Sequence, residues 1–199
     1  MNLNWDSARN RFVFVALAGQ SVYFGYSSDD AGTSWVFGNN GQPVLGGSVT
    51  WDYPSVGVDA SGRIIVGAVQ FVNCTSPPPL FVQCPAGYYS AVSTDGNIFS
   101  GPYTIVSSGG ATSRVVATNG LFEAFVPTLD TNSLPTYIAR YESSNGINWS
   151  TDQTIGMGSF GAPNNNTPPG TSSTILFYAP YLAAQGYTNR GVPGQQCWL

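Results

Sequence analysis

An acidic residue between two aromatic residues is the first candidate for chemistry in this chain. Asp52 lies between Trp51 and Tyr53, just ahead of a predicted strand. Aromatic faces can stack on a sugar ring while a carboxylate accepts hydrogen bonds from the hydroxyl groups of the sugar. Arg114, at the start of another predicted strand, can contact the same kind of ligand. These four residues are the predicted ligand-binding candidates. The alternative is a turn capped by Asp52, with both aromatic side chains in the hydrophobic core.

A hydrolytic mechanism has few candidate residues here. Glycoside hydrolysis uses two carboxylates, and Asp52 can be paired only with Asp130, whose surroundings favour a turn between strands. Serine and cysteine nucleophiles lack the histidine they usually need, because the chain has no histidine. No catalytic residue is assigned.

A motif that occurs three times indicates the elements that must position these residues. Residues 28–35 fit the pattern S-x-D-x-G-x-[ST]-W, and residues 93–99 and 143–149 fit the shorter pattern S-x-[DN]-G-x-x-[FW]. The spacing between copies suits a unit of four short strands. Runs of β-branched and aromatic residues precede the copies, as expected of strands, at residues 21–26, 87–92 and 136–141.

The residue types of the motif are those of a tight hairpin. Asp or Asn can hydrogen-bond its own backbone, and Gly tolerates a positive φ. The closing aromatic residue offers a large apolar surface that can wedge between neighbouring sheets. One design used three times predicts one stacked unit used three times.

The motif resembles the Asp-box, or bacterial neuraminidase repeat, of the sialidase-like β-propeller family. The resemblance covers about residues 2–155 and is supported by a second repeated feature, a predicted inner strand pair at residues 55–69, 113–126 and 4–17. It implies an all-β fold of four-stranded antiparallel propeller blades. It also implies that the Asp-box hairpins are structural and lie away from the ligand site. The motif residues are Ser28, Asp30, Gly32, Trp35, Ser93, Asp95, Gly96, Phe99, Ser143, Asn145, Gly146 and Trp149.

Sialidase activity itself is not predicted. By this resemblance, a sialidase would need three arginines around the substrate carboxylate, a Tyr and Glu pair as nucleophile and base, and an Asp as the acid. The Arg-Ile-Pro signature expected early in sialidases is missing from the chain. Arg11 and Arg63 occupy equivalent hairpin positions and are interpreted as scaffold. Glu123 lies on an apolar strand and Glu142 beside an Asp-box, so neither position suggests a catalytic base.

Composition favours an extracellular protein. Charged residues make up only 8% of the chain, its net charge is −4, and all its basic residues are arginines. The sequence has no basic stripe, which argues against nucleic acid or an anionic membrane as partner, and no apolar run of transmembrane length. We expect no cofactor and no metal site. The first residues do not resemble a signal peptide, so either a leader was removed or the chain is an excised piece.

Three cysteines bear on the compartment. Cys74 and Cys84 flank a proline-rich excursion, and a disulfide between them would fit an oxidising environment. Cys197 is then left either to pair with another segment or chain, or to stay a buried thiol.

The length of the chain raises a question of closure. Repeats at about residues 2–45, 46–110 and 111–155 leave residues 156–199 as a partial, irregular fourth unit of a single propeller domain. Some form of closure is expected, because an open stack of blades exposes apolar faces and strand edges. It can come from a four-bladed ring within the chain, from another polypeptide or from a second copy.

Three functions are compatible with these observations. The first is a secreted, non-catalytic propeller that binds glycans or a protein surface. The second is a fragment or subunit of a glycoside hydrolase. The third is a structural subunit of an extracellular layer or filament.

Overall fold

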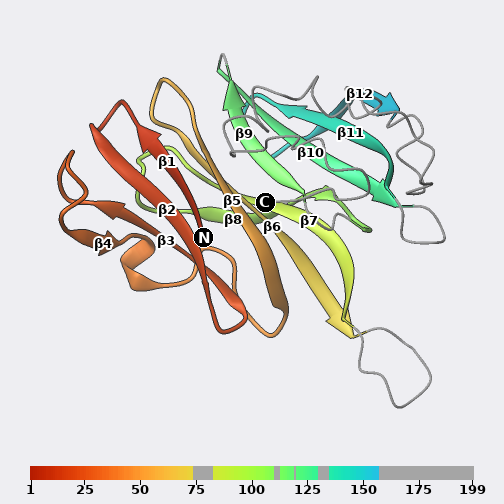
Figure 1. The fold of residues 1–199 in the computed structure, drawn as a ribbon, viewed down its shortest axis with the longest axis horizontal. Coiled ribbons are helices and arrows are strands. Elements are labelled where there is room, and N and C mark those ends of the chain that lie inside the picture. Colours follow the sequence, from red (N-terminus) through yellow and green to blue (C-terminus); the bar gives the residue numbers. More distant parts are fainter. Residues whose placement is uncertain (74–82, 110–112, 119, 130–134, 157–199) are drawn as a thin grey trace, which may run out of the picture. The chain divides into compact units, whose positions relative to one another are not determined.

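The computed structural model describes residues 1–73, 83–109, 113–118, 120–129 and 135–156. These residues form strands and one short 3-10 helix, η1 (Asn39–Gly41), which confirms the predicted all-β class (Figure 1). The strands are β1 (Asn2–Asp6), β2 (Arg11–Ala18), β3 (Ser21–Ser27), β4 (Trp35–Phe37), β5 (Thr50–Val58), β6 (Ile64–Asn73), β7 (Gln83–Ser93), β8 (Ser100–Val106), β9 (Arg114–Thr118), β10 (Leu121–Leu129), β11 (Pro135–Ser143) and β12 (Ser150–Gly156).

The strands form three four-stranded sheets in which sequence neighbours pair. Their orders are β1-β2-β3-β4, β5-β6-β7-β8 and β12-β11-β10-β9. We call these sheets blade 1, blade 2 and blade 3, since their strand number and order are those of propeller blades. The predicted partial fourth blade lies outside the described residues.

The chain divides into two compact units. The first comprises residues 1–127 and 139–153, and it contains all the contacts discussed below. The second comprises residues 128–138 and 154–199, of which the structure describes only parts of β10, β11 and β12. The single-domain boundaries stay a prediction.

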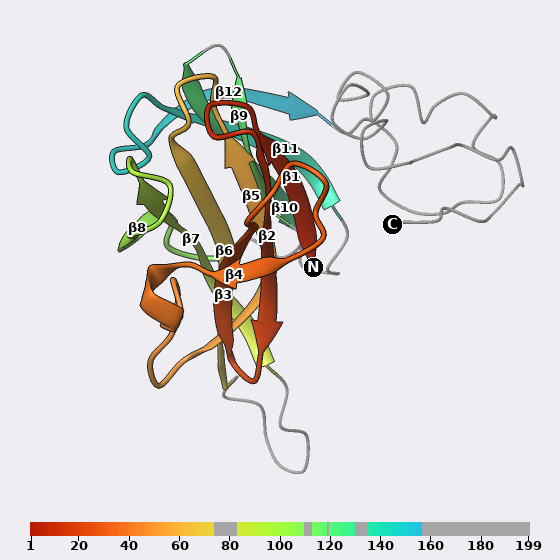
Figure 2. The ribbon, with the colours of Figure 1, turned by 90° about the vertical axis from the view of Figure 1, so that its left-hand side faces the viewer.

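The first strands of the three blades, β1, β5 and β9, lie side by side (Figure 1; Figure 2). The amide of Val56 donates to Asn2 Oδ1 at 3.2 Å, and the amide of Val115 donates to Ser55 Oγ at 3.0 Å. A Cβ on Gly57 would lie 2.9 Å from the amide nitrogen of Ala117, so the backbones of β5 and β9 approach as closely as a glycine allows. Asn4 Nδ2 also donates to the carbonyl of Val56 at 3.3 Å, so the residues of β1 on either side of Leu3 contact the amide and the carbonyl of one β5 residue, as in parallel strands. The three first strands therefore run in the same direction.

This common direction gives the stack two distinct ends. At the start end, β1, β5 and β9 begin. At the hairpin end, each of them turns back into the second strand of its blade. The third strand of each blade runs parallel to the first, so the Asp-box hairpins that follow β3, β7 and β11 also lie at the hairpin end.

Two hydrophobic cores hold the blades together. The core between blades 1 and 2 contains Val13, Phe24 and, from β6, Ile64 and Val66. The core between blades 2 and 3 contains Ile65, Val69, Tyr88, Val115 and Phe122. Successive β6 side chains therefore enter opposite cores, which explains why the sequence of this strand is an unbroken apolar run rather than an alternating one.

Candidate functional site

Trp51 is a core residue. Only 3% of it is exposed, its indole Nε1 donates to the carbonyl of Gly46 at 3.1 Å, and its ring meets that of Tyr89 edge to face, with centroids 5.6 Å apart. It belongs to the core between blades 1 and 2. The prediction that Trp51 stacks on a ligand is therefore wrong, because the register of β5 directs its side chain toward blade 1.

Tyr53, by contrast, presents its ring at the start end. The pairing of β5 with β6 shifts between Asp52 and Ser55, and Tyr53 in this bulge has a φ of 52° and is 36% exposed. A positive φ is uncommon for a residue with a bulky side chain, and the following Pro54 disfavours it further. The ring leans on Phe71, with centroids 6.1 Å apart. Strain of this kind is concentrated at functional sites.

Asp52 is half-buried and accepts the amide of Tyr53 at 2.6 Å. No other carboxylate in the described part of the chain lies at the start end. The rest lie at the hairpin end, on strand ends or in turns: Asp6, Asp29, Asp30, Asp59, Asp95, Glu123, Glu142 and Asp152. Asp130, the predicted possible partner of Asp52, lies outside the described residues.

Arg114 is the one arginine at the start end in the part of the chain that the structure describes. Its neighbour Val115 bonds to Ser55, so Arg114 lies beside the first part of β5. Its guanidinium donates from Nη1 to the carbonyl of Ser113 at 2.8 Å. Within the described ranges it has no ion pair, whereas Arg9, Arg11, Arg63 and Arg140 all do.

At the hairpin end, arginines tie blade 1 to blade 2. The carboxylate of Asp6 pairs with Arg9 at 3.0 Å and with Arg11 at 3.1 Å. Arg9 Nη1 also donates to the carbonyl of Gly62 at 2.7 Å, and Arg11 Nη2 to the carbonyl of Gly96 at 2.5 Å. The first contact reaches the β5–β6 hairpin of blade 2 and the second reaches its Asp-box.

Blade 2 repeats this arrangement toward blade 3 with one arginine. Arg63 pairs with Asp59 at 2.6 Å and donates to the carbonyls of Gly120 at 2.8 Å and Ser144 at 2.6 Å. These carbonyls again belong to the first hairpin and the Asp-box of the following blade. We call each such set of contacts an arginine latch. Arg11 and Arg63 therefore make scaffold contacts.

In each Asp-box turn an Asp or Asn side chain accepts backbone amides, as does the motif serine in the second and third copies. Asp95 Oδ1 accepts the amides of Asn97 and Ile98, both at 2.8 Å, and Asn145 Oδ1 accepts those of Ile147 and Asn148. The amides of Ile98 and Asn97 hold the pKa of Asp95 below its usual value, because they stabilise the ionised carboxylate.

In the first Asp-box the side chain at this position is Asp29, not Asp30. Asp29 accepts the amide of Thr33 at 2.9 Å and also the hydroxyl of Thr33, and these bonds lower its pKa. Asp30 is exposed, and among the described residues its side chain meets Asn10 Nδ2, at 3.4 Å. The first hairpin is longer than the other two, so its Asp precedes its Gly by three residues. The buried serine is likewise Ser27, and Ser28 is exposed.

The aromatic residue that closes an Asp-box packs on the preceding blade. Phe99 meets Phe24 of blade 1, with ring centroids 4.8 Å apart, and Trp149 Nε1 donates to Ser90 Oγ of blade 2 at 3.2 Å. Trp35, which closes the first Asp-box, is 46% exposed.

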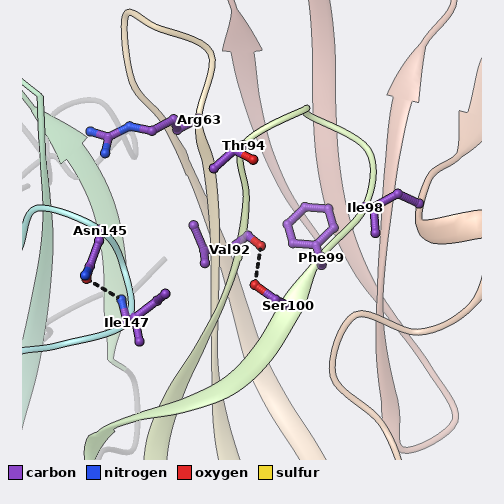
Figure 3. Close-up of a pocket in the computed structure, with 8 residues that line it drawn as sticks. All are labelled: Arg63, Val92, Thr94, Ile98, Phe99, Ser100, Asn145 and Ile147. Carbon is purple, nitrogen blue, oxygen red and sulfur yellow. Dashed lines mark hydrogen bonds between the residues drawn. The ribbon is translucent and has the colours of Figure 1, made fainter.

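A cavity of about 280 Å³ lies between the Asp-boxes of blades 2 and 3, with Ile98 and Phe99 on one side and Asn145 and Ile147 on the other (Figure 3). Arg63, Val92, Thr94 and Ser100 complete its lining. The Arg63 guanidinium is already held by the latch, and Asn145 Oδ1 by its own turn. We therefore interpret the cavity as a gap in the packing between two structural hairpins.

Across the described ranges, no group of three or more acidic, histidine or cysteine side chains is placed to hold a metal ion. No helix in the described part of the chain is long and apolar enough to cross a bilayer. Cys84 is disulfide-bonded, and because Cys74 and Cys197 lie outside the described residues, its pairing with Cys74 stays a prediction.

Comparisons with known proteins bear on the fold. No protein-family model matches the chain, and no curated protein matches its sequence. Among solved structures, it is similar to a protein of unknown function from Dyadobacter fermentans, with a TM-score of 0.54 and 14% identity, over 77% of this chain and 53% of that one.

Two glycoside hydrolases are also similar to the chain, with lower scores. One is the GH32 beta-fructofuranosidase of Bombyx mori, with a TM-score of 0.49 and 13% identity over 77% of this chain and 34% of that one. The other is an alpha-L-arabinofuranosidase from Clostridium thermocellum, with a TM-score of 0.48 and 13% identity over 83% of this chain and 53% of that one.

The chain thus spans about half the length of the Dyadobacter fermentans protein and about a third of the length of the Bombyx mori enzyme. At these identities the likeness concerns the fold alone. The three four-stranded sheets of sequence-neighbouring strands make the chain an all-β protein built of β-propeller blades. The sialidase-like resemblance stays a prediction.

Proposed function

We propose that the chain is a non-catalytic propeller module of a secreted protein and that it binds glycans at the start end. One observation carries this proposal. Among the described residues, the start end holds one carboxylate, Asp52, and one arginine without an ion pair, Arg114, on neighbouring first strands, and the exposed and strained Tyr53 follows Asp52.

These three side chains have the chemistry that sugars require. A sugar presents an apolar ring face and a set of hydroxyl groups that both donate and accept hydrogen bonds. The Tyr53 ring supplies an apolar surface, the guanidinium of Arg114 supplies donors, and the carboxylate of Asp52 supplies an acceptor. An acidic sugar would gain a bidentate contact with Arg114. An extracellular protein surface is the other partner that such a site would accept.

The test is binding of a panel of neutral and acidic oligosaccharides, followed by isothermal titration of those that bind. Tyr53→Ala and Arg114→Ala are each expected to weaken binding at least tenfold, since each removes a contact worth about 1.4 kcal/mol or more. Ile98→Ala, an exposed apolar change at the hairpin end, is the matched control. Binding that survives both start-end changes would contradict the proposal.

A glycoside hydrolase is the second candidate, and the half-buried carboxylate of Asp52 favours it. Hydrolysis needs a second carboxylate about 5 to 9.5 Å away. The described part of the start end holds none, so this alternative depends on Asp130 or on another chain. Turnover of aryl glycosides that is lost in both Asp52→Asn and Asp130→Asn would support it. Inactivity across a broad substrate panel would exclude it.

A further inference from the structure

The side of blade 1 that faces away from blade 2 is covered with aromatic rings. Side chains at alternate positions of β1 to β4 form an interlocked layer, with ring centroids 4.7 Å apart for Trp5 and Phe12 and 5.3 Å apart for Phe14 and Trp35. Trp35 is 46% and Phe37 is 60% exposed. We call this surface the aromatic face, and its members are Trp5, Phe12, Phe14, Tyr23, Trp35 and Phe37.

The same face of blade 2 is covered by blade 1. Because the turns of Asp6 and Asp59 correspond, Phe12 and Phe14 occupy the positions of Ile64 and Val66, both of which are 0% exposed beneath blade 1. Trp35 likewise corresponds to Phe99, which packs on Phe24 of the preceding blade. The interfaces within the chain therefore show what covers such a face: the apolar side of another blade.

Blade 1 also offers the acceptors of an arginine latch. Asn10 has a φ of 50° at the tip of its first hairpin, the conformation of Gly62 (82°) and Gly120 (81°), whose carbonyls each accept an arginine of the preceding blade. The contact between Asn10 and Asp30 brings the first Asp-box beside this tip, as in the latched blades. Within the described residues, no guanidinium donates to Asn10 or to this Asp-box.

We propose that the aromatic face of blade 1 is an interface for a further propeller blade of the same repeat, one with an apolar side and an arginine in its first hairpin. The arginine would donate to the carbonyl of Asn10 and to the first Asp-box, while the apolar side covers Trp35 and Phe37. This occupant continues the two interfaces that the chain already contains.

Blade 3 of a second copy does not have this chemistry. Its first hairpin has Leu121 where blade 2 has Arg63. On the side of blade 3 that faces away from blade 2, Arg140 pairs with Glu123, Glu142 and Asp152, so three acids surround one cation. Burying that cluster against aromatic rings would remove charges from water without compensation.

The experiment is a fusion that supplies a blade with this chemistry. A copy of residues 46–110, which includes Arg63, is joined ahead of residue 1 of the full chain. Binding of a hydrophobic dye and acrylamide quenching of the Trp35 fluorescence should both fall several-fold, with Trp35→Phe identifying the Trp35 signal. The same fusion with the added arginine changed to alanine, and a fusion with residues 111–155, should protect Trp35 less. A fused blade that adds β signal in circular dichroism but protects nothing would overturn the proposal.

A second measurement keeps the proposal testable if the fused blade does not fold. In the unmodified chain, Trp35 should be readily quenched, and light scattering should give a mass that Trp35→Ser leaves unchanged. A Trp35 signal that resists quenching would overturn the proposal, because the face would already be covered. Dimers that Trp35→Ser disperses would also overturn it, by making a second copy the occupant.

Discussion

The two ends of the innermost strands differ in how their polar residues are used. At the hairpin end the same solution appears repeatedly: an Asp holds an arginine, the arginine reaches the next blade, and an Asp or Asn closes the Asp-box. At the start end Asp52, Tyr53 and Arg114 each occur once and follow no repeat. In a repeat protein, features shared by every unit serve the stack, so the singular residues are where a binding site should be sought.

The largest expected effect on stability comes from a substitution at the hairpin end. Asp6 has no exposed side-chain surface and faces two arginines, so Asp6→Ala leaves their charges uncompensated and should lower the free energy of unfolding by about 3 kcal/mol. Asp52→Ala at the start end should change it by less than about 0.5 kcal/mol. Urea unfolding of the two variants measures the difference. Equal losses would contradict the division between scaffold and site.

The next effect concerns pH. Burial raises the pKa of Asp59, but hydrogen bonds from Ser61 and Arg63, with the charge of Arg63, together hold it below its usual value. Its ionised form therefore stabilises the fold above the unfolded-state pKa of about 4, and this contribution is lost as the pH falls through the lower folded-state pKa. Asp59→Asn should be less stable near pH 7 and should lose less stability below pH 4.

Thermal unfolding measured between pH 2 and 7 compares these two proteins. An acid limb that is as steep in the Asp59→Asn variant as in the parent chain would show that the latch carboxylate does not contribute.

A smaller effect distinguishes two adjacent residues of the first Asp-box. Asp29→Ala removes the acceptor of the Thr33 amide and should lower the unfolding temperature, while Asp30→Ala should leave it unchanged. Differential scanning calorimetry of both variants makes the comparison. If Asp30→Ala is the more damaging change, the turn is closed as the sequence motif suggested.

The smallest expected effect on stability comes from a substitution at the start end. Tyr53→Gly removes the side chain from a position with a φ of 52°, where glycine is not strained, so the relief of about 1 kcal/mol offsets the lost contact with Phe71. We expect chemical denaturation to show no loss of stability. A marked loss would mean that the ring serves packing rather than binding.

The fold was predictable because its signals are local. An Asp or Asn near a Gly specifies a hairpin wherever it occurs, and the closing aromatic residue indicates the packing between sheets. The difference between Trp51, which is buried, and Tyr53, which is exposed, was not predictable, because it depends on a bulge that β5 forms only when paired with β6. The arginine latches were also not predictable from the sequence, because their acceptors are backbone carbonyls far along the chain, such as the carbonyl of Gly96 for Arg11. Asp29 was missed because two aspartates are adjacent in the longer first hairpin.

The role of the start end is tested by comparing glycan binding by the parent chain, Tyr53→Gly and Asp95→Ala in isothermal titration. We expect Tyr53→Gly to fold normally and to lose binding, and Asp95→Ala to be less stable but to bind with unchanged affinity at a temperature where it is folded. Loss of binding in Asp95→Ala with full binding in Tyr53→Gly would place the site at the hairpin end and contradict the account.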